Sequence, residues 1–320
     1  MNNYKPPYTI TSKMVNLISS ISEELTRIEY NKKEIITPQL RKKNRVKTIA
    51  GTLEIEGNFL GEDKITAILD GKRVLGTYQE VLEVEGVIDS YKEFENYQFD
   101  SLEDLLKSHK LLMNGILKTA GRLRAVNVQV GVHIAPPHGV VSGLMQDLFE
   151  WLKNSDEHPL IKSCVFHYEF EFIHPFSDGN GRVGRLWQSV ILNQYKKLFG
   201  AIPIESVVRD NQEKYYKALE DSGNVGESTP FIEFMLDIIL KTLEKVKKEN
   251  VPKNVPKNVP LKRLDKILAL IDKNRNITIL ELSVKLNVTD KTIKRDIAKL
   301  KDENKIIRVG SSKAGYWEVV

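Results

Sequence analysis

The sequence predicts a mainly α-helical body followed by a small α+β unit. Two observations support this prediction. Apolar residues recur with a helical period through most of residues 1–250, and an Asn-Val-Pro triplet occurs three times just after residue 249. Proline at every fourth position removes amide donors and bars a helix, so the repeat predicts an extended linker. A chain of 320 residues is long enough to form a unit on either side of it.

Five apolar stripes with a period near 3.6 predict the main helices of the body. They run from Met14 to Ile28, Val46 to Leu53, Val141 to Leu152, Ile161 to Phe172 and Val183 to Ile191. Gly57 should end the second helix, and Pro159 suits the first turn of the fourth. Only residues 123–134 alternate with a period of two, which predicts a short strand or hairpin within the helical body.

The charge is unevenly distributed along the chain. Residues 251–320 hold 16 Lys or Arg and 8 Asp or Glu, a balance of +8, whereas the other residues balance at −3. The basic tail therefore suits a polyanion, although a solvated lysine-rich surface explains the same charge.

No apolar stretch is long enough to span a bilayer, the N-terminus lacks a signal-peptide core, and Cys164 is the only cysteine. We expect a cytoplasmic protein in which Cys164 is a buried apolar residue.

The central motif lies between the fourth and fifth helices, from His174 to Arg185. A Gly-Asn-Gly segment opens the fifth helix, where free backbone N–H groups and the positive end of the helix form an anion site. Arg182 and Arg185 are three residues apart beside that site, and two guanidinium groups suit a polyphosphate. Asp178 can hold Mg²⁺, and His174 can take a proton from a hydroxyl. The chain has no P-loop sequence.

This segment resembles the signature of the Fic family, H-x-F-x-D/E-G-N-G-R-x-x-R, with every defined position filled. The resemblance extends over roughly residues 5 to 245 and includes a flap at residues 121–137. It implies a Fic-type helical bundle with a β-hairpin flap that transfers AMP from ATP to a protein hydroxyl. His174 would be the catalytic base and Asp178 the Mg²⁺ ligand.

The same resemblance implies an ATP-binding set drawn from four parts of the chain. The motif would hold the phosphates, the flap would border the nucleotide, Tyr216 and Asn224 would contact the adenine, and Glu56 would come from an inhibitory helix. The full set is Glu56, Val130, Gly131, Val132, His133, His174, Gly179, Asn180, Gly181, Arg182, Val183, Gly184, Arg185, Tyr216 and Asn224. Tyr215 is expected in the core, and a solvated strand residue is an equal alternative for His133.

A second motif lies upstream, at Thr52, Glu56 and Gly57. Thr52 and Glu56 are four apart and share a helix face, and Gly57 should leave Glu56 in the last helical turn. A carboxylate there faces the negative end of the helix dipole and needs a cation. The segment matches the [S/T]-x-x-x-E-[G/N] inhibitory motif of Fic proteins, which implies that Glu56 pairs with Arg185 and withholds it from the γ-phosphate of ATP.

The tail is similar to a winged helix-turn-helix. Apolar residues predict helices around Leu264–Ile271, Thr278–Leu286 and Ile293–Leu300, the last capped by Thr289, and two strands follow after Lys305. The third helix presents Lys291, Lys294, Arg295 and Lys299 for DNA. Its acidic residues, including Asp296, keep protein docking equally open.

We therefore expect four regions: a helical region with the inhibitory helix at 1–110, a Fic catalytic core at 111–245, a linker at 246–260 and the winged helix at 261–320. The expected partners are ATP with Mg²⁺, a target protein with a Ser, Thr or Tyr hydroxyl, DNA at the winged helix and a second copy of the chain. Two alternatives stay open: a DNA-binding regulator whose body only senses nucleotide, and a hydrolase that removes AMP. The donor could also be another nucleotide, such as UTP.

Overall fold

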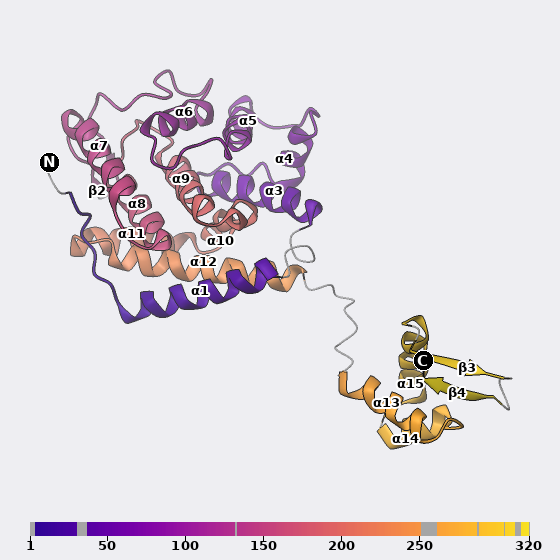
Figure 1. The fold of residues 1–320 in the computed structure, drawn as a ribbon. Helices are drawn as coiled ribbons and strands as arrows, with labels where there is room; N and C mark the ends of the chain where they lie inside the picture. Colours follow the sequence, from indigo (N-terminus) through magenta and orange to yellow (C-terminus); the bar gives the residue numbers. More distant parts are fainter. Residues whose placement is uncertain are drawn as a thin grey trace. The chain divides into compact units, whose positions relative to one another are not determined.

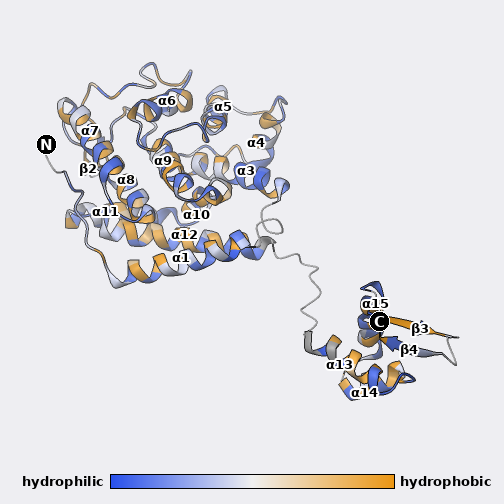
Figure 2. Cartoon of the chain, viewed as in Figure 1, coloured by the Kyte–Doolittle hydropathy of each residue, from blue (hydrophilic) through white to orange (hydrophobic). Residues whose placement is uncertain are grey.

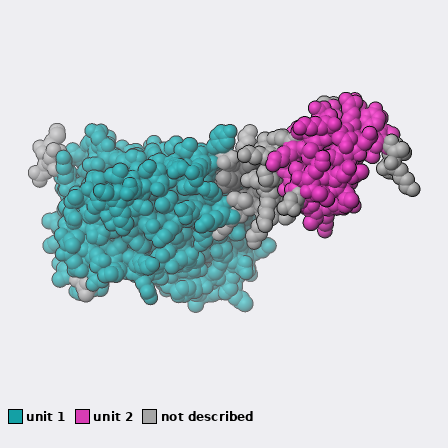
Figure 3. Space-filling view, turned by 90° about the horizontal axis from the view of Figure 1, so that it is seen from below, with its two compact units in different colours: residues 1–250 teal, residues 251–320 magenta. Residues whose placement is uncertain are grey.

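The structure is a computed structural model that describes residues 4–30, 37–131, 133–250, 261–286, 288–303, 305–310 and 315–319. Side chains at 249, 250, 261, 262 and 265 are outside the description. The chain divides into two compact units, Met1–Asn250 and Val251–Val320 (Figure 3). The predicted linker falls largely on residues 251–260, which lie outside the described residues.

The first unit is a helical bundle with one small hairpin (Figure 1). Its elements are α1 (Ser12–Tyr30), α3 (Pro38–Ile55), α4 (Glu62–Leu69), α5 (Tyr78–Lys92), α6 (Leu102–Leu112), β1 (Gln129–Val130), β2 (His133–Ile134), α7 (His138–Asn154), α8 (Pro159–Ile173), α9 (Asn180–Tyr195), the 3₁₀ helix η1 (Lys197–Ala201), α10 (Ile204–Arg209), α11 (Gln212–Val225) and α12 (Thr229–Asn250).

Two central helices, α8 and α9, form the core of this unit, and the loop between them carries the motif. Nearly every residue of α8 from Leu160 to Ile173 is buried, as expected of a helix that is apolar all round. The long helices α1 and α12 pack against each other along the edge of the bundle (Figure 1). Hydrophobic and hydrophilic residues both occur along the two helices (Figure 2), and the buried residues of α1 are Met14, Ile21, Leu25 and Ile28. The five predicted helices are all present, and Cys164 is fully buried.

Local signals explain where several helices begin and end. Thr37 caps α3 by accepting a hydrogen bond from the Leu40 N–H, and Thr77 forms a capping box with Glu80 at α5. Helix α3 ends at Ile55, and Gly57 follows with a φ of 88°. The expectation that Glu56 belongs to the last turn is wrong by one residue, because Glu56 is the C-cap residue itself.

The flap hairpin is shorter than the alternation at residues 123–134 suggests. Gln129 pairs with Ile134 and Val130 with His133, so only two residues on each side form the ladder. Val126, Val130 and Ile134 are exposed. Neither face of this hairpin is buried, and an isolated two-stranded hairpin is only marginally stable, so the alternation does not extend the strands.

The second unit is a small winged helix-turn-helix. It contains α13 (Leu261–Lys273), α14 (Ile279–Leu286), α15 (Asp290–Asp302), β3 (Ile306–Val309) and β4 (Tyr316–Val319), with β3 and β4 antiparallel. Trp317 fixes the wing to the helices, because its ring nitrogen donates to the Ile277 carbonyl at 3.1 Å and its amide donates to the Arg275 carbonyl at 2.8 Å. The tip of the wing, residues 311–314, lies outside the described part of the chain.

Across the described residues of both units, the helices are too short or too polar to cross a membrane.

Candidate functional site

The motif loop is held in an unusual backbone conformation at His174. This residue ends α8 with a φ of 49° and is the non-glycine residue with positive φ among those described. Left-handed backbone at a residue other than glycine is uncommon and carries strain, which is typical of functional sites. The His174 amide still donates to the Phe170 carbonyl at 2.9 Å. The turn therefore follows directly from the helix and brings His174 next to the start of α9.

Burial keeps His174 in its neutral form. It lowers the pKa of the imidazole to about 4, outweighing the Glu171 main-chain hydrogen bond, which acts in the opposite direction. The side chain remains 17% exposed, so the ring is accessible. At neutral pH His174 can accept a proton, which is the requirement for a general base.

The Gly-Asn-Gly segment exposes backbone donors at the start of α9. Gly179 is the N-cap residue with a φ of 83°, a conformation that glycine adopts without strain. The Asn180 side chain is buried and bonded to both main-chain groups of Phe176, each at 2.9 Å. Asn180 thus fixes the loop with its side chain, and only its main chain is left for an anion. The first N–H groups of α9 have no partner within the helix, so they can bind an anion.

Arg182 strengthens the anion site because its donors are unmet. Its side chain is only 4% exposed, and Nε and Nη1 have no hydrogen-bond partner among the described residues. The nearest carboxylates are Glu83 at 3.9 Å and Asp178 at 3.8 Å, too far for hydrogen bonds. Leaving a buried guanidinium unsatisfied is costly, so this arrangement favours an anionic ligand.

Asp178 has one carboxylate oxygen bonded to the loop and an exposed side chain. Its side chain is 58% exposed, and Oδ1 accepts the Gly179 amide at 2.6 Å, which leaves the other carboxylate oxygen available. The described residues contain no cluster of three or more His, Cys, Asp or Glu that could hold a metal by itself. Mg²⁺ usually takes one or two carboxylates and completes its shell with phosphates and water, so a single exposed aspartate fits it.

Arg185 is buried and fully engaged by the end of α3. Its Nη2 donates to Glu56 Oε1 at 2.6 Å and to the Thr52 carbonyl at 3.2 Å, and its Nε donates to Thr52 Oγ1 at 3.0 Å. Burial opposes the charged form of Glu56, but Arg185 nevertheless holds the pKa of that carboxyl below its usual value. Thr52 and Glu56 therefore act together on one guanidinium.

The Glu56 carboxylate also touches the anion loop. A Cβ atom added at Gly181 would lie 2.5 Å from Glu56 Oε1 and 2.9 Å from Arg185 Nη1. Only glycine at this position leaves room for the pair. The end of α3 is anchored nearby, since Arg209 bonds Glu54 at 2.7 Å and Gln212 donates to the Ile55 carbonyl at 3.0 Å.

The remaining predicted nucleotide residues lie on the flap and on α11. Val130 and Gly131 are exposed on the hairpin, and His133 Nε2 lies 2.9 Å from the Phe172 carbonyl. Val132 lies outside the described residues. Tyr216 is 48% exposed and Asn224 is also exposed, so both can contact a ligand. Tyr215 is in the core as expected, and its hydroxyl meets His167 Nε2 at 3.1 Å.

The comparisons with known proteins agree with this site. The Fic/DOC family profile matches residues 99–192. A crystal structure of a Fic family protein from Desulfovibrio desulfuricans is 37% identical, covers 99% of this chain and 98% of that chain, and superposes with a TM-score of 0.74. This chain belongs to the Fic family. Fic-1 from C. elegans, at 21% identity, 74% and 71% coverage and a TM-score of 0.59, shares the fold.

Among curated proteins, the chain is similar to Protein adenylyltransferase Fic of Culex quinquefasciatus, with 29% identity over 210 residues. The protein of the same name from Drosophila erecta is 33% identical over 148 residues. The first alignment covers 62% of this chain but only 41% of the relative, so the chain spans about two fifths of its length. An HTH domain profile matches residues 263–316, which agrees with the winged helix.

Arg124 lies within the predicted flap but had no expected role of its own, and it holds the flap to the loop at His174. Its guanidinium donates to the carbonyls of His174 at 2.8 Å, Val126 at 2.8 Å and Pro136 at 2.5 Å, and its amide donates to the Pro175 carbonyl at 2.9 Å. One buried side chain thus ties both ends of the flap to the residues around His174. Its position just after Gly121, at the foot of the flap, was the available signal.

Two further residues behind the Fic loop were also missed. His109 stacks on Phe176 at 3.6 Å between ring centroids, and its Nε2 lies 3.0 Å from the Asp178 carbonyl. Glu171 Oε2 lies 4.0 Å from His174 Nδ1, and burial raises the pKa of Glu171 to about 7. His167 and Glu171 are four apart on one face of α8, and His174 follows three residues later at the end of the helix. This spacing was the signal for the buried polar row.

The basic residues predicted on the third helix of the winged helix are all at the surface. Lys291, Lys294, Arg295 and Lys299 are exposed on α15. Asp296, which had weakened the case for DNA, is 1% exposed and bonds Arg263 at 2.8 Å. Its charge is therefore neutralised inside the unit and does not face a ligand.

Proposed function

We propose that this chain transfers AMP from ATP to a hydroxyl group of a target protein and of itself, and that Glu56 inhibits the transfer by pairing with Arg185. The observation that carries the proposal is the 2.6 Å bond between Glu56 and the buried Arg185, formed against the glycine loop beside His174. An inhibitory carboxylate at this place is meaningful only if the loop otherwise binds phosphate.

In the proposed reaction His174 takes the proton from the target hydroxyl. The freed oxygen attacks the α-phosphorus of ATP, a new P–O bond forms, the bond to the oxygen that bridges the α- and β-phosphorus breaks, and pyrophosphate leaves. The neutral state of His174 supports the role of base, since burial lowers the pKa of its ring to about 4.

The phosphates would lie on the first turn of α9. The main-chain N–H groups of Gly179, Asn180 and Gly181 would bind the transferred group, and the unmet donors of Arg182 support its place beside them. Val183 and Gly184 would complete the turn. Asp178 would hold Mg²⁺, which neutralises phosphate charge when bound.

In this proposal Glu56 inhibits the transfer by changing the position of ATP. With Arg185 held by Glu56, the γ-phosphate has no partner there, and ATP binds with its α-phosphate out of line with the hydroxyl. An error of about 1 Å in such alignment can reduce a rate by roughly 10²-fold. Thr52 shares the hold on Arg185, and Gly57 ends the helix that presents both residues.

Substrates and partners follow from the exposed elements. Tyr216 and Asn224 would contact the adenine, while Val130, Gly131, Val132 and His133 would border the nucleotide. The flap would pair with the target segment, as an added strand does. DNA is proposed as the ligand of α15, since its four cations are exposed and Asp296 is neutralised internally.

Incubation with α-labelled ATP, Mg²⁺ and the purified chain tests the function. By mass spectrometry we expect one added AMP per modified hydroxyl. The fraction of modified protein should increase when Glu56 is replaced by glycine. If the Glu56→Gly variant binds ATP but never retains the label covalently, the result would favour nucleotide sensing. Release of AMP from a modified protein without any transfer would favour the hydrolase alternative.

A further inference from the structure

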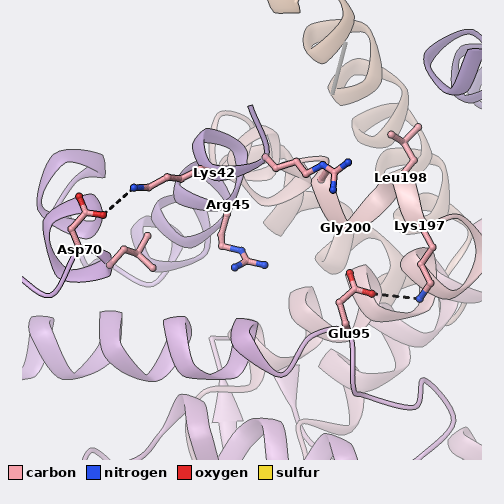
Figure 4. A pocket seen from close by; sticks show the side chains of 10 residues that line it. Lys42, Arg45, Asp70, Glu95, Lys197, Leu198 and Gly200 are labelled. Atoms are coloured by element: carbon pink, nitrogen blue, oxygen red, sulfur yellow. Dashed lines mark hydrogen bonds and ion pairs between the residues drawn. The ribbon is translucent and has the colours of Figure 1, made fainter. Parts of the chain in front are cut away.

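A basic cavity lies at the first half of α3 and shares no lining residue with the loop at His174 (Figure 4). Its volume is about 620 Å³, within the range of small-molecule sites. One wall carries Arg41, Lys42 and Arg45 from α3, and the opposite wall carries Lys197 from η1.

The acids in the cavity are already paired. Asp70 bonds Lys42 at 2.9 Å, and Glu95 lies 3.5 Å from Lys197. The side chains of Arg41 and Arg45 are exposed and, in contrast, form no hydrogen bond or ion pair with any residue in the described ranges. The Arg45 side chain extends into the space between the two ion pairs (Figure 4). Two guanidinium groups therefore remain for a ligand.

Positive charge is concentrated at this part of α3, although the first unit as a whole has a small negative balance. Residues 41–47 hold five Lys or Arg, and no acidic residue occurs from 38 to 53, although residues 1–250 balance at −3. Arg41 and Arg45 are four apart on one helix, where like charges repel. Arg41 also lies at the end of the first turn of α3, near the positive end of the helix dipole, where a cation is unfavourable. A bound anion would relieve both effects.

We propose that this cavity binds a small molecule that carries a diphosphate group. A guanidinium binds phosphate with two parallel hydrogen bonds, so two of them on one helix face suit two linked phosphoryl groups. Lys42 and Lys197 add positive charge at the margins, and the partly exposed side chain of Leu69 provides an apolar surface for an organic substituent.

The cavity lies between α3 and η1, and α3 also positions Glu56. Arg45 precedes Glu56 by eleven residues on α3, about 16 Å along the helix axis. The far wall, η1, leads into α10, and α3 packs on α10 so closely that a Cβ at Gly51 would lie 2.7 Å from the Glu205 backbone. An anion held by Arg45 and Lys197 together stabilises the arrangement of α3 and η1 seen here.

Titration calorimetry with inorganic pyrophosphate and the full chain, without metal, tests the site. The Arg41→Ala/Arg45→Ala variant should bind at least about tenfold more weakly than wild type. Lys43→Ala is the matched control, because Lys43 is exposed on the same helix but does not line the cavity. Arg182→Ala separates this site from the glycine loop. Lys43→Ala should keep the wild-type affinity. Arg182→Ala should keep the binding that the double arginine variant loses, whatever binding it loses at the glycine loop.

Three results would overturn the proposal. Absence of binding by wild type at millimolar pyrophosphate excludes the site. An equal loss in Lys43→Ala means that only the general field of the helix attracts the anion. A loss in Arg182→Ala with none in the double arginine variant assigns the binding to the glycine loop. Circular dichroism of each variant confirms that the helices are intact.

Discussion

Glu56 and Arg185 are 129 residues apart in the sequence and 2.6 Å apart in the structure, where they form a salt bridge at the mouth of the anion loop. Arg185 is 3% exposed and Glu56 is 29% exposed, so the pair is shielded from solvent on one side only. The open side leaves the Glu56 carboxylate partly accessible to solvent. This asymmetry suits a carboxylate that acts as a switch.

Replacing Glu56 by glycine should raise self-modification about 10²-fold, because Arg185 becomes free to hold the γ-phosphate and align the α-phosphate. The gain should appear in turnover more than in ATP affinity, since alignment matters most near the transition state. Initial rates with labelled ATP measure it. Glu56→Gln should give a smaller gain, because the amide keeps a hydrogen bond but loses the charge.

The double variant Glu56→Gly/Arg185→Ala is the control for this coupling. It should lose the gain, because the two residues act as one pair. The single Glu56→Gly variant should also unfold more easily, by on the order of 2 kcal/mol, since Arg185 stays buried without its partner. A Glu56→Gly protein no more active than wild type would return Glu56 to a structural or hydrolytic role.

His174→Ala in the Glu56→Gly background should reduce transfer by at least about 10²-fold while ATP affinity stays within a small factor. The physical reason is that the phosphates are held by backbone N–H groups and arginines, whereas the proton is taken by the imidazole. Calorimetry gives the affinity and labelled ATP gives the rate. Equal rates with and without the imidazole would remove the general-base mechanism.

The pH dependence of transfer should reflect the lowered pKa of His174. Burial lowers that pKa to about 4, so the ring should stay neutral as the pH falls through 6.5. The transfer activity should be lost only near pH 4, where the ring becomes protonated. In the Glu56→Gly variant the pH at which activity is lost should be no higher than in wild type, because the Glu56 charge acts to raise the His174 pKa. Rates from pH 4 to 8, with circular dichroism at each pH, measure it. A midpoint near 7 would instead point to the buried Glu171, whose pKa is about 7.

Asp178→Asn should weaken the dependence of transfer on Mg²⁺. The amide can still accept the Gly179 N–H bond that Oδ1 accepts at 2.6 Å, so the loop should keep its shape. It lacks the negative charge that a hard cation prefers. We expect a rightward shift of the Mg²⁺ titration of about tenfold or more. An unchanged titration would mean that the metal is held by the phosphates alone.

In the winged helix, Lys294→Glu with Arg295→Glu should abolish most DNA binding and flatten its salt dependence, because each lost phosphate contact reduces the number of released counterions. Lys266→Glu on α13 is the control, since it changes an exposed cation outside α15. Mobility shifts at several salt concentrations measure both. No binding by the wild-type chain at low salt would favour a protein ligand for this unit.

The sequence alone determined the features that depend on neighbouring residues. Apolar periodicity predicted five helices of the first unit and the three of the second, and Thr289 was correctly expected to cap α15. The twelve contiguous residues from His174 to Arg185 predict an anion loop with a base beside it. These features are readable because a turn, a cap or a helix face is decided by residues within a few positions of each other.

Only the tertiary structure decided which distant groups meet. It placed Asp296 against Arg263, removing an acid from the surface of α15, and left Arg182 buried with unmet donors. It also brought Arg124 to carbonyls on both the flap and the catalytic loop, and it set Arg45 and Lys197 across one cavity. Spacing along the chain carries no information about such contacts, because they depend on how whole helices pack and on which buried groups that packing leaves without a partner.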